Sequence, residues 1–311
     1  MPVVADPAES LAGLAGFAKG SSALDGDRAI DPRIEPLFSK LGGLCSLPAV
    51  AQQVIQVADD PDADAGDLVD VIEQDPAVAV RLMQVVNSAY CGLRNPVGDL
   101  RTAVTMLGSE RVGTLALTVS IGAMFSRDTP VGRFDPERLW DHSVCVATVS
   151  RHLAARVAGV HPDEAYLAGL LHDLGLLFIT QHLEPLTPKV LVRVEAGGAL
   201  AVAEREVMGF DHAQVGAYVA WRANLPETLV GAIDYHHDPL SCPKACQRIT
   251  RVVSLANYLA TRHGRGSIEG RRLPAPPEGV LQPLGVDLHS FRSMWSELPH
   301  TLAGVEELTR R

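Results

Sequence analysis

Apolar residues recur along most of the chain with the spacing of an amphipathic helix. In the stretch DPAVAVRLMQVVNSAYCG, Asp75 and Pro76 supply an N-cap and a first-turn proline, and Gly92 ends the segment. Four apolar residues fall at i, i+4, i+7 and i+8 on one face, namely Val78, Leu82, Val85 and Val86. This pattern predicts a helix with one buried stripe.

The same signals continue toward the C-terminus, whereas signals for strands are scarce. Asp211 is a further predicted N-cap, and prolines mark four more helix starts, at Pro136, Pro162, Pro188 and Pro226. Period-two alternation is rare, and no Asn-Gly or Asp-Gly hairpin turn separates two apolar runs. We therefore predict an all-α fold, a helical bundle with two subdomains.

Breaks in the helical pattern divide the chain. Residues 1–33 are rich in Ala, Gly, Ser and Asp without a sustained period, and we expect a weakly ordered tail there. Gly, Pro and charged residues interrupt the pattern after residue 125, which separates a helical subdomain over 34–125 from a second one over 135–265. Residues 266–311 are predicted to form a Pro-rich linker and a C-terminal helix.

Composition limits the classes of partner. The chain has 311 residues, is 47% hydrophobic and carries a formal net charge of -10, which opposes nucleic-acid binding through phosphate neutralisation. Without an apolar run of about 18 residues or a basic signal-peptide start, we expect no membrane span and a cytoplasmic location. The five scattered cysteines indicate ordinary reduced thiols. Cys242 and Cys246 would suit a metal site, but no second pair completes one.

The candidate chemistry lies in the second subdomain. Its six candidate metal ligands are His142, His172, Asp173, His212, His236 and His237. His142 shares a helical stripe with Val146, Val149 and Leu153, so its imidazole is expected to face the core. His172 and Asp173 adjoin an apolar run, on a helix predicted to stop at Gly175, and a buried carboxylate needs a partner or a metal.

The position of each histidine on its helix bears on its charge. His212 is in the first turn of a predicted helix, where the dipole favours the neutral imidazole that binds metals. His236 and His237 precede Pro239 at a predicted helix C-terminus, where the dipole favours a cation. Imidazole and carboxylate ligands together suit Fe, Mn, Zn or Ni. The alternative is a polar core network without a metal.

At this point the chain resembles the HDOD family, the HD-related output domains of bacterial signalling proteins. The resemblance runs from Ile34 to His263 and is carried by LPAV, DPAVAVRLMQVVNSAY, AVTMLG, LAGLLHDLGLL and AIDYHHDP. It implies an HDOD domain over 34–265, with an all-helical fold related to HD phosphohydrolases and HD-GYP phosphodiesterases. It also implies that the six candidate ligands occupy the places of a metal-binding set.

Two departures from the active enzymes weigh against hydrolysis. Asn257 replaces the late aspartate ligand, and Leu176 stands where a phosphate-neutralising lysine follows the His-Asp pair. The GYP signature is absent as well. We therefore favour a regulatory protein whose HDOD domain is a non-catalytic output or protein-interaction module. The alternative is a metal-dependent phosphohydrolase or cyclic-dinucleotide phosphodiesterase that uses His172 and Asp173.

Three polar residues of the first subdomain allow two interpretations. Asn87, Ser88 and Tyr90 either form a partner-binding surface or cap a helix with Tyr90 half-buried, and we favour the cap. The expected partners are signalling proteins, from cyclic-dinucleotide or two-component pathways. Trp140 and Trp221 are on predicted helices beside candidate ligands, and we expect them in the core or in a pocket wall. Glu204 and Glu206 are expected on the surface, with contact to a histidine as the alternative for either carboxylate.

Overall fold

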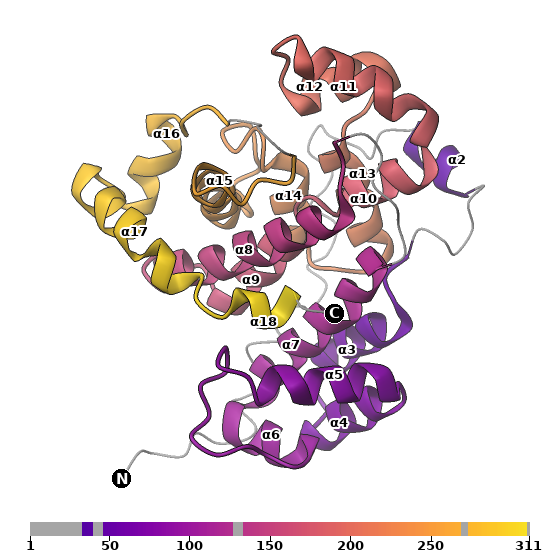
Figure 1. Ribbon diagram of the computed structural model, residues 1–311, viewed down its shortest axis with the longest axis vertical. Helices are drawn as coiled ribbons and strands as arrows, with labels where there is room; N and C mark the ends of the chain where they lie inside the picture. Colours follow the sequence, from indigo (N-terminus) through magenta and orange to yellow (C-terminus); the bar gives the residue numbers. More distant parts are fainter. Residues whose placement is uncertain (1–32, 40–45, 127–132, 269–272, 310–311) are drawn as a thin grey trace. The chain divides into compact units, whose positions relative to one another are not determined.

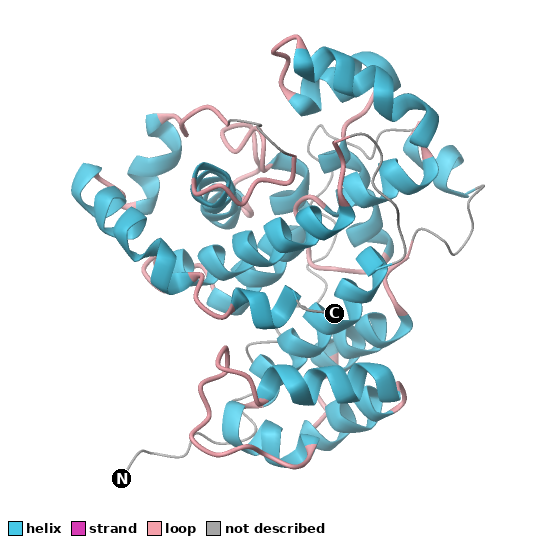
Figure 2. Cartoon of the chain, viewed as in Figure 1, coloured by secondary structure: helices cyan, strands magenta, loops and turns pink. Residues whose placement is uncertain are grey.

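The chain folds as a set of helices (Figures 1 and 2). The structure, a computed structural model, describes residues 33–39, 46–126, 133–268 and 273–309. Within these ranges no strand occurs, and Phe134 and Ile268 form an isolated β-bridge. The predicted all-α fold is confirmed. Residues 1–32 of the expected N-terminal tail are not among the described residues.

None of the helices in the described ranges combines the length and the apolar character that crossing a membrane requires.

The described residues belong to two compact units. The first, here the N-terminal unit, contains residues 47–124 and 303–309, and the second, here the histidine unit, contains residues 33–39, 46 and 125–302 apart from the gaps. The region expected to hold one C-terminal helix ends in two, α17 (Leu288–Thr301) in the histidine unit and α18 (Val305–Thr309) in the N-terminal unit. They are separated at Gly304, whose positive φ of 86° interrupts helical geometry.

The N-terminal unit is built from five consecutive helices and the last helix of the chain. They are α3 (Ala49–Asp59), α4 (Ala65–Glu73), α5 (Pro76–Val86), α6 (Leu100–Leu107), α7 (Ser109–Gly122) and α18 (Val305–Thr309). Helix α5 begins as predicted, because the Asp75 carboxylate accepts hydrogen bonds from the amides of Ala77 and Val78. The stripe Val78, Leu82, Val85 and Val86 is buried.

The histidine unit contains one helix from before the N-terminal unit and those from α8 to α17. They are α2 (Ile34–Ser39), α8 (Pro136–Ala154), α9 (Pro162–Leu171), α10 (Leu174–His182), α11 (Thr187–Glu195), α12 (Leu200–Met208), α13 (His212–Arg222), α14 (Glu227–Tyr235), α15 (Gln247–Arg262), α16 (Glu278–Leu281) and α17 (Leu288–Thr301). Short 3-10 turns are η4 (Glu184–Leu186) and η5 (Gln282–Leu284), and a third, η3 (Ala123–Ser126), contains the boundary between the two units. The predicted caps Asp135 and Asp211 begin α8 and α13.

Glycines let the helices of this unit approach closely. A Cβ on Gly169 of α9 would lie 2.9 Å from Ala147 Cα of α8, and a Cβ on Gly175 of α10 would lie 1.9 Å from the carbonyl oxygen of His212. Only a residue without a side chain fits at either crossing. The prediction that a helix stops at Gly175 is wrong: the break comes earlier, at His172 and Asp173, and Gly175 is inside α10.

Candidate metal centre

The Asp173 carboxylate stands at the break between α9 and α10. Asp173 occupies the N-cap position of α10, where an aspartate usually accepts a hydrogen bond from the helix, but its side chain makes no such bond. The carboxylate instead faces four imidazoles. The Nε2 atoms of His142 and His172 lie 3.5 Å from Oδ2, and those of His212 and His236 lie 3.3 Å and 3.5 Å from Oδ1.

Four places in the fold contribute these side chains. His142 comes from α8, His172 and Asp173 from the α9–α10 break, His212 from the first position of α13, and His236 and His237 from the end of α14. The candidate ligand atoms of Asp173, His212, His236 and His237 all lie within 4.8 Å of one another, and so do those of His142, His172 and Asp173. The structure therefore brings together all six predicted residues.

Backbone carbonyls orient three of the imidazoles through Nδ1. The pairs are His142 with Arg265 at 2.5 Å, His172 with Gly169 at 2.7 Å, and His236 with Ile233 at 2.7 Å. Because a carbonyl oxygen only accepts, each Nδ1 must carry the hydrogen. In a neutral ring Nε2 then presents a lone pair, and this lone pair is directed toward Asp173.

In this buried site the Nε2 lone pairs of the imidazoles, which are hydrogen-bond acceptors, face the oxygens of the Asp173 carboxylate, which are acceptors as well. Nε2 of His172 and Nε2 of His236 have no hydrogen-bond partner among the described residues. Burial lowers the pKa of His172 to about 3, so its ring is neutral, although the Asp173 carboxylate opposes this shift. A neutral nitrogen and a carboxylate oxygen repel each other unless a cation or a proton lies between them. The residues present fit a divalent cation.

Glu204 orients the imidazole of His212, the fourth ring around Asp173. Its Oε2 accepts hydrogen bonds from the backbone amide of His212 at 3.0 Å and from Nδ1 at 2.5 Å. Burial would lower the pKa of His212, but the negative charges of Glu204 and Asp173 and their hydrogen bonds raise it to about 10. The expectation that the helix N-terminus keeps His212 neutral is therefore outweighed by a buried carboxylate.

A proton accompanies the His212 and His237 pair. The two Nε2 atoms are 2.8 Å apart, and a protonated His212 donates to His237. Metal binding at His212 Nε2 requires this proton to leave, so binding releases a proton. The pKa of Asp173 is well below its ordinary value: burial would raise it, but the nearby His172 and His212 lower it further. The carboxylate is an anion.

Two acidic residues differ in a way that the sequence left open. Glu204 is 1% exposed and bonded to His212, whereas Glu206 is exposed and pairs with Arg193 at 3.0 Å. Only Glu204 contacts a histidine. Of the two tryptophans expected in the core or a pocket wall, Trp140 is buried, whereas Trp221, in the last turn of α13, is 42% exposed.

The two departures from the enzyme pattern are both buried. Leu176 is fully buried in α10, so no cationic side chain stands at this position. Asn257 is in α15, and its Oδ1 accepts a hydrogen bond from the Thr261 hydroxyl at 3.2 Å. A neutral amide engaged with a hydroxyl adds no negative charge to the candidate centre.

Asn87, Ser88 and Tyr90 make local contacts. Asn87 follows the last residue of α5, and its side-chain amide exchanges two hydrogen bonds with the backbone of Val97, at 2.8 and 3.0 Å. The Ser88 hydroxyl donates to Val85 O at 2.7 Å, and Tyr90 is half-buried. These contacts fit the interpretation as a helix cap. A partner-binding role for the three residues stays a prediction.

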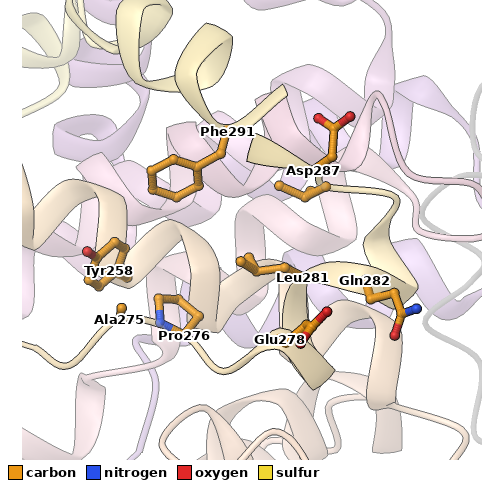
Figure 3. Close-up of a pocket in the computed structure, with 9 residues that line it drawn as sticks. Tyr258, Ala275, Pro276, Glu278, Leu281, Gln282, Asp287 and Phe291 are labelled. Atoms are coloured by element: carbon orange, nitrogen blue, oxygen red, sulfur yellow. The ribbon is translucent and has the colours of Figure 1, made fainter. Parts of the chain in front are cut away.

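A separate apolar hollow lies in the same unit (Figure 3). It has a volume of about 600 Å³, and its apolar lining includes Tyr258, Pro276, Leu281, Val286 and Phe291. Glu278 and Asp287 also line it, but Asp287 is bound to Ser290 as the N-cap of α17. None of the six candidate ligands lines this hollow.

The HDOD domain family matches residues 44–239, which is more than half of the chain. The chain therefore belongs to the HDOD family, as its motifs predicted, and the HD-type helical fold is confirmed.

The chain is also similar to solved structures and to a curated protein. An HDOD domain protein of unknown function from Geobacter sulfurreducens is 27% identical, with a TM-score of 0.75 over 90% of this chain and 99% of that one. A Marinobacter aquaeolei VT8 protein, provisionally described as a signal transduction protein, is 25% identical with a TM-score of 0.69, over 97% of this chain and 65% of that one. An uncharacterized Treponema pallidum (strain Nichols) protein is 27% identical over 71% of this chain, which spans only 43% of that relative.

Proposed function

We propose that this chain is a bacterial signal-transduction protein whose HDOD domain holds a divalent metal ion and acts by contact with partner proteins, without hydrolysing a substrate. Membership of the HDOD family and the likeness to a protein provisionally described as a signal transduction protein support the regulatory role. The observation that carries the rest of the proposal is the convergence of four buried imidazoles on one carboxylate.

The residues that would hold the metal are the six that converge. Asp173 supplies the charge, His142, His172, His212 and His236 present Nε2 toward it, and His237 contacts His212. Imidazole with one carboxylate suits Fe, Mn, Zn or Ni. A divalent ion bound there would supply Lewis acidity toward water or a phosphate oxygen. The surrounding carbonyls and Glu204 fix each ring, as partners of metal-bound histidines do.

Burial favours a structural or regulatory centre over a hydrolytic one. The side chains of His172, His212 and His236 are 0% exposed and that of Asp173 is 2% exposed, whereas His237 is part-buried. A phosphoester substrate must touch the metal, and these side chains leave it no exposed ligand face except beside His237. Without a cation at Leu176 or a second acid at Asn257, the charge of a phosphate transition state is also poorly balanced.

A second candidate function follows from the same residues. The complete set of histidines with Asp173 supports a metal-dependent phosphohydrolase or cyclic-dinucleotide phosphodiesterase. In this alternative His172 and Asp173 would act at the reacting phosphate, and the unit would have to open for substrate to enter. The regulatory interpretation requires no such opening.

Metal analysis and an activity assay on the same sample separate the two. The full chain, expressed in medium supplemented with Fe and Mn, should contain about one divalent ion per chain, and His172→Ala should lose it. His289→Ala, which changes an exposed histidine of α17, is the matched control and should retain the metal.

The metal-containing protein should then show no turnover of bis(p-nitrophenyl) phosphate or cyclic dinucleotides above the His172→Ala background. Turnover that disappears in His172→Ala would establish the hydrolase instead. Absence of metal from the wild-type chain, before and after reconstitution with each of the four metals, would contradict both candidate functions.

A further inference from the structure

Two cysteines are in contact in the connection between α14 and α15. Their Sγ atoms are 2.7 Å apart, with both thiols reduced. Cys242 is 2% exposed and Cys246 is 4% exposed. Cys246 directly precedes α15, and a Cβ on Gly231 of α14 would lie 2.5 Å from its sulfur. The pair is therefore enclosed between two helices, and neither cysteine takes part in the metal centre.

The two sulfurs are almost positioned for a covalent bond. A disulfide has an S–S distance of about 2.05 Å, so the sulfurs need to approach by only about 0.7 Å. Local hydrogen bonds hold the connection in place. The Gln247 side chain donates to the carbonyl oxygen of Cys242 at 2.9 Å, and the Thr250 hydroxyl donates to that of Cys246 at 2.8 Å. Bond formation thus requires a small local movement.

The environment makes the two thiols unequal. The hydrogen bond from Cys246 lowers the pKa of Cys242, although burial opposes this change. The same hydrogen bond and burial raise the pKa of Cys246. Since the thiolate is the nucleophile, Cys242 is the residue that attacks and Cys246 the one that resolves.

We propose that Cys242 and Cys246 form a redox-active dithiol, which a peroxide converts into an intramolecular disulfide. The proposal is independent of the metal centre, because it needs only the contact between the two sulfurs and an oxidant small enough to enter the unit.

The reaction balances with hydrogen peroxide as the oxidant. The Cys242 thiolate attacks one peroxide oxygen, an S–O bond forms, the O–O bond breaks, and the hydroxide that leaves is protonated to water. The Cys246 sulfur then attacks the Cys242 sulfenic acid, an S–S bond forms, the S–O bond breaks, and a second water leaves with the Cys246 proton. Two thiols lose two electrons in total, and one peroxide is reduced to two waters.

Peptide mapping tests the proposal, because Lys244 lies between the two cysteines. The native full chain is treated with hydrogen peroxide, blocked with an alkylating reagent, and digested with trypsin without reductant. Cleavage after Lys244 separates Cys242 from the peptide Ala245–Arg248, which contains Cys246, so only a disulfide keeps them together. We expect the joined peptides to appear with peroxide and to separate on reduction. The chain should remain free of intermolecular bonds on a non-reducing gel.

Variants test the order of the steps. Cys242→Ser should abolish the joined peptides, whereas Cys246→Ser should leave a sulfenic acid on Cys242 that dimedone traps. Cys145→Ser is the matched control, since Cys145 is buried in α8 and burial raises its pKa to about 12. It should leave the joined peptides unchanged.

Three outcomes would overturn the dithiol: both cysteines still alkylated after peroxide, sulfinic acid without a disulfide, or pairing with another cysteine such as Cys91. The wild-type map decides the proposal even where a serine variant fails to fold.

Discussion

Helix α8 carries two histidines that meet carboxylates in different ways. His142 is buried, donates through Nδ1 to the carbonyl oxygen of Arg265, and places Nε2 3.5 Å from Asp173. The side chain of His152 is 29% exposed, and its Nε2 lies 3.0 Å from the Glu297 carboxylate of α17. Both are histidine–carboxylate contacts within one unit, but only the first is one of four imidazoles around one acid.

The difference shows what separates a ligand set from a surface ion pair. At His152, solvent and Arg156, which pairs with Glu297 at 2.6 Å, share the charge, so no further cation is required. At Asp173, several rings are oriented by carbonyls and the lone pairs meet a buried anion. The direction of Nδ1 and the burial, rather than the presence of a His–Asp contact, indicate a metal site.

The largest expected effect comes from closing the helix crossing that assembles the centre. Gly175→Ala puts a Cβ 1.9 Å from the carbonyl oxygen of His212, so α10 and α13 must separate. We expect the free energy of unfolding to fall by about 3 kcal/mol, together with loss of metal. Gly98→Ala, where no atom lies within 4 Å of the added Cβ, is the control. Urea denaturation measures the free energy of unfolding of both variants. Equal stability of the two would contradict the close contact between α10 and α13 at Gly175.

Removing the central charge should have the next largest effect. In Asp173→Asn the four imidazoles face a neutral amide, so the affinity for a divalent metal should fall by more than about 100-fold with the helical content retained. Competition with a fluorescent chelator measures the affinity. Asp70→Asn, which removes an exposed partner of Arg101, should bind as wild type does. If Asp173→Asn binds the metal with wild-type affinity, the contact of His142 with Asp173 is not part of a metal site and does not differ in function from the contact of His152 with Glu297.

Glu204 should have a smaller effect, because it acts through His212. Glu204→Gln preserves an oxygen that can accept from Nδ1 but removes the buried charge, and we expect metal affinity to decrease about 10- to 100-fold. The matched control is Glu206→Gln on the same helix, whose carboxylate is exposed and pairs with Arg193. A similar loss in both variants would show a general charge effect and not the orientation of His212.

Local signals predicted the helices, whereas the centre depended on their crossing. Asp75 and Asp211 begin helices as their types predict, and the apolar stripe of α8 correctly turns His142 inward. No local periodicity of the sequence predicts the convergence of the rings, because it requires α10 and α13 to contact each other at Gly175. Glu204 looked like a surface charge because its role depends on His212, eight positions along the chain and on another helix.

The smallest expected effect concerns the surface contact between His152 and Glu297. Hydrogen bonds from Ser293 and His152, together with the charge of Arg156, lower the pKa of Glu297. A carboxyl whose pKa is lowered by folding stabilises the protein above its unfolded pKa, and this stabilisation is lost as the pH falls through its folded pKa. Glu297→Gln should therefore lower the Tm slightly near pH 7, and the difference should disappear below about pH 4 and shrink in high salt.

The metal content of Glu297→Gln should not change at any pH where wild type keeps its metal, because Glu297 contacts His152 and not the rings around Asp173. A Tm difference that persists in acid, or a loss of metal, would mean that the two histidines of α8 do not act separately.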